Sequence, residues 1–340
     1  MKNIIISSLL MAGLLCSCEK PHTEGPDDNR RIYLTANTIE TKAPFDGTVP
    51  SESQRLDALV CVSTTPYSYP SNGEDGTTDG TIGKHLQVQF SSGTRQLING
   101  AYYNQSKPDQ AVYFSAMHPQ AGWSFTDNTM AHFSFDGSDD VMFAPQVIGK
   151  YGNQNPPTLH FQHLLTWIRL EIKADSEAVA TAWGPLKSIT VGSKNSISID
   201  LSKEFNKNGV EFGNDISMPF YKTSSPEEIF PDEQTGYTMT LASQEVAYVL
   251  CAPVIASDQD SFDGARIPEY FIHIESENRE VDIEVDLMHA AGSYFNDSTM
   301  GRQFTLSLTF KMGNTIATST SITDWETGGV GFGKIEETEQ

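Results

Sequence analysis

A cysteine close to the start of the chain offers the clearest covalent chemistry in the sequence. Lys2 and an apolar stretch over residues 4–15 precede it, and residues 15–18 read Leu-Cys-Ser-Cys. A small residue directly before a cysteine, behind a short basic and apolar leader, is typical of secretory signals of the lipoprotein type. We therefore expect residues 1–17 to be removed and the thiol of Cys18 to carry an acyl chain such as palmitate.

Two other interpretations of this leader remain open, an ordinary secretory signal and a short transmembrane anchor. The apolar stretch is shorter than the roughly 20 residues that span a bilayer. It ends abruptly in Glu-Lys-Pro at residues 19–21, without a stop-transfer pattern. Residues 18–30 are polar and contain two prolines and a glycine, so we expect them to form a tether.

Histidines could ligate a metal ion, but their spacing argues against it here. His160 and His163 are three residues apart, which puts them on opposite faces of a strand. On a strand they cannot share one ion, and we expect a hydrogen-bonded structural role for His163.

Acidic residues form two further candidate sites. Residues 258–264 with Glu269 resemble a calcium loop, but Phe262 stands at a ligand position and the glycine is one place late. Asp139 and Asp140 could be paired acids, yet no base or nucleophile is placed near them. We therefore expect residues 258–264 to form a solvated loop and the two aspartates to lie in a turn. Hydrolase, phosphate-loop and dinucleotide motifs are missing from the sequence, so we expect no enzymatic activity, no metal and no cofactor.

Composition excludes further classes of function. The chain of 340 residues has 44 acidic and 22 basic residues, a formal net charge of −22. Such a surface repels phosphate backbones, so no nucleic-acid partner is expected. With 38% hydrophobic residues the chain has enough apolar material to fold. Beyond the leader, Cys61 and Cys251 lie in apolar runs and are expected to be buried free thiols.

Short runs that alternate apolar and polar residues predict strands throughout the chain. Helices are expected only over residues 176–183 and 226–230. The two prolines in residues 153–157 lack the N–H donors that a sheet needs, so they mark the expected domain boundary. We predict an all-β protein with two antiparallel β-sandwich domains in tandem, over residues 31–155 and 156–335. Strands are expected over residues 31–39, 59–63, 85–90, 111–115, 131–135, 166–172, 188–191, 196–201, 237–241, 245–250, 270–274, 281–287, 303–311 and 316–322.

Seven segments, taken in order, carry a family resemblance: the leader with Cys18 and residues 40–43, 113–119, 139–142, 159–172, 301–310 and 322–325. They resemble the fimbrillin family, the lipoprotein pilins of Bacteroides-like bacteria. Lys42 stands where relatives often carry arginine, and the end of the chain is short and rich in glycine. The resemblance implies transthyretin-like sandwiches, assembly by strand exchange with other fimbrial subunits, and a location at the outer membrane, the cell surface and the fimbrium.

Applied to this chain, strand exchange assigns roles to three groups of residues. Ile32, Leu34 and Ala36 share one face of the first strand, which would act as a plug over the core. A maturation protease of trypsin-like specificity would cut at Lys42 or Arg55. The vacated groove would accept a donor strand from the C-terminal region. The candidate donor residues are Trp325, Val330, Phe332 and Ile335.

A different class of function remains as the alternative, a surface lipoprotein that binds glycan or another ligand without polymerising. Exposed aromatic rings would stack on sugars, although most aromatic residues of a sandwich belong to its core. A hydrolase built on a β-sandwich is the third interpretation. The aromatic candidates are Tyr67, Tyr69, Tyr102, Tyr103 and Trp123.

Overall fold

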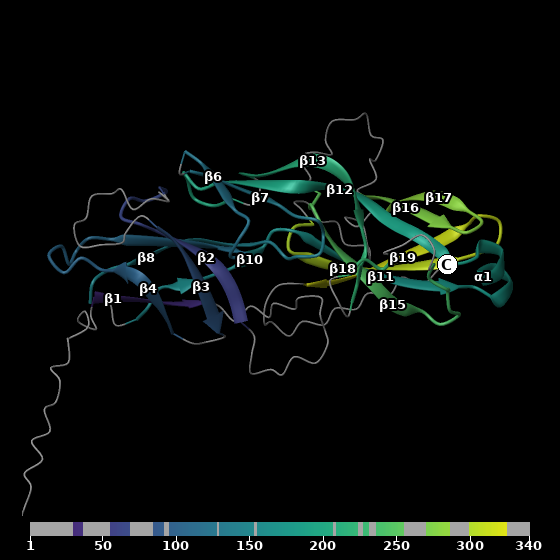
Figure 1. Cartoon of the computed structure of the whole chain (residues 1–340), viewed down its shortest axis with the longest axis horizontal. Coiled ribbons are helices and arrows are strands. Elements are labelled where there is room, and N and C mark those ends of the chain that lie inside the picture. Colours follow the sequence, from purple (N-terminus) through teal and green to yellow (C-terminus); the bar gives the residue numbers. More distant parts are fainter. Residues whose placement is uncertain are drawn as a thin grey trace, which may run out of the picture.

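A computed structural model shows that the protein is nearly all β (Figure 1). The predicted all-β class is therefore confirmed. The structure describes residues 30–36, 55–68, 84–91, 95–127, 129–152, 155–206, 209–223, 227–230, 236–254, 270–285 and 299–324.

The first half of the chain forms two sheets that enclose one hydrophobic core. A five-stranded sheet has the order β10-β8-β5-β2-β3, and a three-stranded sheet has the order β4-β1-β9. All neighbours in the larger sheet are antiparallel, whereas β1 and β9 are parallel. The strands are β1 (Arg31–Ala36), β2 (Arg55–Ser63), β3 (Lys84–Ser91), β4 (Gln96–Tyr102), β5 (Val112–His118), β8 (Met142–Gly149), β9 (Thr158–Leu159) and β10 (Gln162–His163).

The remaining strands form two sheets, one of five and one of six strands. One has the order β14-β15-β11-β18-β19, and the other has the order β17-β16-β12-β7-β6, with β13 paired to β12. The strands are β6 (Ser124–Thr126), β7 (Met130–Ser134), β11 (Thr166–Ala174), β12 (Leu186–Asp200), β13 (Val210–Pro219), β14 (Tyr221–Lys222), β15 (Gln244–Cys251), β16 (Tyr270–Ser276), β17 (Glu280–Val285), β18 (Arg302–Phe310) and β19 (Ile316–Asp324).

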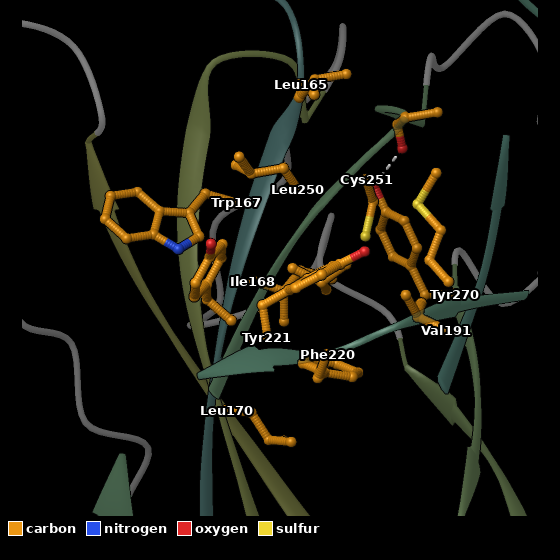
Figure 2. Close-up of a cluster of buried hydrophobic side chains, with 14 of the residues drawn as sticks. Leu165, Trp167, Ile168, Leu170, Val191, Phe220, Tyr221, Leu250, Cys251 and Tyr270 are labelled. Carbon is orange, nitrogen blue, oxygen red and sulfur yellow. Dashed lines mark hydrogen bonds between the residues drawn. The ribbon is translucent and has the colours of Figure 1, made fainter. Parts of the chain in front are cut away.

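Strand β11 lies at the centre of the five-stranded sheet of this pair. It pairs with β15 in antiparallel and with β18 in parallel orientation along almost its whole length. Its apolar side chains are buried on both faces of the strand. Leu170 and Ile172 are fully buried and Trp167 is 5% exposed. Figure 2 shows Trp167 beside Leu250 of β15.

Two hydrogen-bonding patterns cross the predicted boundary near residue 155. The hairpin β6–β7 precedes that boundary but pairs with residues 196–200 of β12. Conversely, β9 and β10 follow it but pair with β1 and β8. The first pattern follows from the length of β12, which runs for 15 residues, whereas β16 pairs only with its first part. The division into residues 31–155 and 156–335 stays a prediction.

The helix α1 (Glu177–Trp183) confirms one of the two helix predictions. The Ser176 hydroxyl accepts a hydrogen bond from the Val179 N–H at 3.3 Å, which caps the first turn. Gly184 ends the helix with a φ of 73°, a conformation that favours glycine. Trp183 is buried edge-on against Phe310. Within the described ranges α1 is the only helix, and it is far too short to cross a bilayer.

The second helix prediction, over residues 226–230, is wrong for its described part. Glu228 forms a β-bridge to Tyr221, and the Ile229 N–H donates to the Phe220 carbonyl at 2.9 Å. The strand predicted over residues 237–241 reduces to one bridge between Tyr237 and Leu186. Each of the two segments, in its described part, thus pairs with a neighbouring strand through single bridges and forms no regular helix or strand.

Candidate functional site

Strand β1 covers the hydrophobic core of the first half. Ile32 and Leu34 are fully buried and Ala36 is 6% exposed, while the residues between them are half-buried. This alternation follows from the pleat, because successive side chains of a strand point to opposite faces. The core beneath β1 contains side chains from strands on both sheets, among them Ala58, Val60, Val88, Phe90, Ile98, Val112, Phe114 and Ala144.

The backbone of β1 is held by two short segments that lie far away in the sequence. β4 pairs with its first part, with an irregularity between Arg31 and Tyr33, and β9 pairs with Thr35 and Ala36. One further hydrogen bond runs from the Thr35 N–H to the Pro157 carbonyl at 3.0 Å. β1 is thus an inner strand, but each neighbour covers only part of its length.

Side chains on the outer face of β1 add two contacts that the sequence did not reveal. The Arg95 guanidinium lies 3.7 Å from the centroid of the Tyr33 ring, a cation–π contact. The hydroxyls of Thr35 and Thr158 are 2.8 Å apart and share a hydrogen bond. Nothing in the local sequence pairs these residues, because the segments meet only in the folded protein.

Most other residues of the predicted assembly site lie outside the described residues. These are Cys18, Lys42 and the candidate donor residues Trp325, Val330, Phe332 and Ile335. The exception is Arg55, the first residue of β2, which stands opposite Ser91 of β3. Lys42 falls between β1 and β2, and Arg55 is already part of a sheet.

His163 and Asp140 form a buried pair where the two halves of the protein meet. The His163 Nδ1 lies 2.7 Å from an Asp140 carboxylate oxygen, and both side chains are less than a tenth exposed. The expected hydrogen-bonded role of His163 is confirmed. His160 is exposed and does not take part. Asp140, which was expected only to form a turn, is the partner that the sequence analysis missed.

The turn that contains Asp140 brings several carboxyl groups together. The Asp136 carboxylate accepts hydrogen bonds from the Ser138 N–H at 2.9 Å and from its hydroxyl at 2.6 Å. Partial removal from water raises the pKa of Asp139, and the carboxylates of Asp136 and Asp140 raise it further, whereas His118 lowers it. Among the described residues, no group of three histidine, cysteine or acidic side chains is placed to hold a metal ion. The calcium-like loop over residues 258–264 lies outside them.

The two cysteines of the folded part are buried free thiols, as predicted. Burial raises the pKa of Cys61 to about 12 and also raises the pKa of Cys251. A thiol that stays protonated is a poor nucleophile. Neither cysteine therefore has the chemistry of a reactive site.

The aromatic residues considered for sugar stacking are mostly engaged within the fold. Tyr103 is 5% exposed, and Trp123 lies against Phe133 and donates to the Pro119 carbonyl at 2.9 Å. Tyr102 is half-buried, and Tyr69 lies outside the described residues. Tyr67 lines a shallow cleft together with Phe143, Asp200, Lys203 and Phe205.

Comparison of the sequence with known protein families identifies the family of this chain. A family profile described as fimbrillin-like matches residues 65–325, which begin just after β2 and end just after β19. The match covers most of the chain, so the protein belongs to the fimbrillin-like family. No curated protein sequence matches the chain.

A solved structure from Bacteroides uniformis shares the fold. A putative cell adhesion protein from Bacteroides uniformis is 15% identical, with a TM-score of 0.50 over 88% of this chain and all of that one. The fimbrial anchor protein Mfa2 from Porphyromonas gingivalis is 10% identical, with a TM-score of 0.42 over 91% of this chain and 99% of that one. At such identities, the likeness to the Bacteroides uniformis protein shows the fold alone.

Proposed function

We propose that this protein is a structural or adhesive fimbrial subunit that is exported as a lipoprotein and assembled by strand exchange. Membership of the fimbrillin-like family supports the fimbrial role and a cell-surface location. The observation that carries the assembly mechanism is β1, a short inner strand whose apolar face covers the core. No catalytic activity is part of the proposal.

The order of the N-terminal segments links release of the strand to release of the lipid. Cys18 precedes β1, and Lys42 follows it. One cut after Lys42 would therefore remove the lipid anchor and β1 in the same fragment. A cut at Arg55 would fall at the start of a paired strand, so Lys42 is the favoured site for a maturation protease.

Loss of β1 would leave a groove that favours a replacement strand. Burial of Ile32 and Leu34 contributes about 1.5–3 kcal/mol each, so the empty groove would expose costly apolar surface. The edges of β4 and β9 would also lose their hydrogen-bond partner, which makes them templates for another chain.

The replacement strand would come from the C-terminal region of a neighbouring subunit. Val330 and Phe332 are two residues apart, as Ile32 and Leu34 are, so they would share one face of an extended strand. Trp325 and Ile335 could supply further apolar side chains. Until the cut, the acyl chains on Cys18 would hold the subunit at the outer membrane.

Limited trypsin digestion of the recombinant protein tests this mechanism. Intact protein should stay monomeric, and protein trimmed to Lys42 or Arg55 should form multimers in light scattering. Cys18→Ala provides the matched test in cells, where it should abolish surface fibres. A trimmed protein that stays monomeric beside any fimbrial partner, or normal fibres from the Cys18→Ala strain, would refute the proposal.

A second candidate function is glycan binding without polymerisation. The cleft beside Tyr67 favours it, because aromatic rings and the polar groups of Asp200 and Lys203 line one concave surface. Tyr67 has a φ of 54°, which is unusual for an aromatic residue, and its N–H donates to the Gln146 amide oxygen at 2.9 Å. A glycan binder would remain intact in culture, and polysaccharide in a native gel would retard it.

A further inference from the structure

The outer surface of strands β16 and β17 carries an exposed aromatic ring that takes no part in the proposed assembly. Tyr270, Ile272 and Ile274 of β16 are buried, and Figure 2 shows Tyr270 within the core. Because side chains alternate along a strand, Phe271 points to the outer surface. It is 50% exposed.

Carboxylates of β17 line one side of this ring in a regular pattern. The strand register places Glu284 opposite Phe271, Asp282 opposite His273 and Glu280 opposite Glu275. Residues directly opposite each other share a face of the sheet. We call this surface the acidic face; it consists of Phe271, His273, Glu275, Glu280, Asp282 and Glu284.

The charges on the acidic face are only partly compensated within the described residues. Glu275 stands directly opposite Glu280, an arrangement that destabilises a sheet because like charges repel. His273 is the only basic side chain in these paired positions. Its Nδ1 lies 2.8 Å from the Asp282 carboxylate, and its Nε2 lies 3.8 Å from the Glu280 carboxylate.

The sheet leaves space beside the exposed ring. Gly192 of β12 is the neighbour of Phe271, since a Cβ built on it would lie 3.7 Å from the Phe271 carbonyl oxygen and 3.9 Å from its Cβ. The glycine has no side chain to cover the aromatic residue. Beyond it, the Ser217 hydroxyl donates to the Thr190 hydroxyl at 2.7 Å, so this side is bordered by small groups.

We propose that the acidic face binds an extended basic segment of another polypeptide, with an arginine over the Phe271 ring. Glu280, Asp282 and Glu284 alternate along β17, so their side chains repeat at about 6.8 Å, as do same-face side chains of any extended polypeptide. A guanidinium stacks favourably on an aromatic face. Charge complementarity then sets the partner and speeds its association.

This surface is separate from the assembly groove. β16 and β17 lie at the opposite end of the molecule from β1 (Figure 1). The inference therefore does not depend on strand exchange. Its test uses the intact monomer, so failure of the assembly proposal would leave it unaffected.

Fluorescence anisotropy with the full chain tests the inference. The probe is a short labelled peptide that alternates arginine and threonine, and the same peptide with lysine for arginine is the comparison. The triple variant Glu280→Gln, Asp282→Asn, Glu284→Gln should weaken binding about tenfold or more. Phe271→Leu, which keeps an apolar side chain but removes the ring, should weaken the arginine peptide about threefold to fivefold and the lysine peptide less.

A matched control separates the face from the overall charge. The triple variant Asp109→Asn, Glu204→Gln, Glu211→Gln removes the same charge from exposed positions elsewhere and should bind like the parent. An equal loss of peptide affinity in both triple variants, or no binding of the peptide by the parent protein, would overturn the inference. So would an unchanged affinity of Phe271→Leu for arginine, or a neutral oligosaccharide that displaces the peptide from this face.

Discussion

Strands β1 and β11 are both inner strands with buried apolar side chains, but the sheet holds them very differently. β11 pairs with β15 and β18 along almost its whole length, whereas β1 pairs with β4 over one part and with β9 over another. Under the proposed mechanism, the extent and continuity of backbone pairing, and not side-chain burial, would distinguish a permanent strand from a removable one.

Truncation of a core side chain on β11 should have the largest effect on stability. Trp167→Ala should lower the free energy of unfolding by about 3–5 kcal/mol, because a buried aromatic side chain leaves a cavity. Urea denaturation of the purified protein measures this. A variant as stable as the parent would show that the indole does not contribute to the core, and would favour a ligand-stacking role for aromatic residues.

A charge on the inner face of β1 should loosen that strand without unfolding the protein. Leu34 is fully buried, so Leu34→Asp places an unpaired carboxylate in the core and should speed trypsin trimming. Thr35→Asp, one residue along on the outer face, is the matched control and should leave the trimming rate unchanged. Equal rates in the two variants would mean that the inner face of β1 does not hold the strand in place.

The turn between β7 and β8 contains Asp139, whose charge should have a smaller, pH-dependent effect on the stability of the protein. Folding raises the pKa of Asp139. The folded protein is therefore less stable when this carboxyl group is ionised than when it is protonated. The stabilising contribution of protonation is present at acidic pH and is lost as the pH rises through the raised pKa.

Replacement of this carboxyl group should therefore stabilise the protein at neutral pH. Asp139→Asn is expected to raise the melting temperature slightly at pH 7, and the gain should vanish below the ordinary pKa range of carboxyl groups. Thermal melts of both proteins across pH measure the difference. A gain that persists at low pH would trace to the amide's hydrogen bonds instead of the charge.

Local patterns in the sequence predicted most strands, including the inward side chains of β1. Alternation of Ile32, Leu34 and Ala36 with polar residues was visible because the period of a strand is two. β4 and β13 were missed because Asn-Gly and Gly-Asn pairs interrupt their apolar pattern. The polar stretch in the middle of β12 likewise made one long strand look like two.

Long-range arrangement was the part that the sequence could not supply. The pairing of β7 with β12 joins residues more than sixty positions apart, and no turn or spacing signals it. The same holds for the contact of Arg95 with Tyr33. In each case, the residues come from segments whose proximity arises only when the sheets form.

The N-terminus of the mature protein in surface fibres tests the central claim most directly. Fibres sheared from cells can be analysed by mass spectrometry or Edman degradation. If β1 is a removable strand, the chains should begin after Lys42 or Arg55 and lack residues 31–36. Chains that begin at an acylated Cys18 and still carry β1 within an assembled fibre would contradict the account.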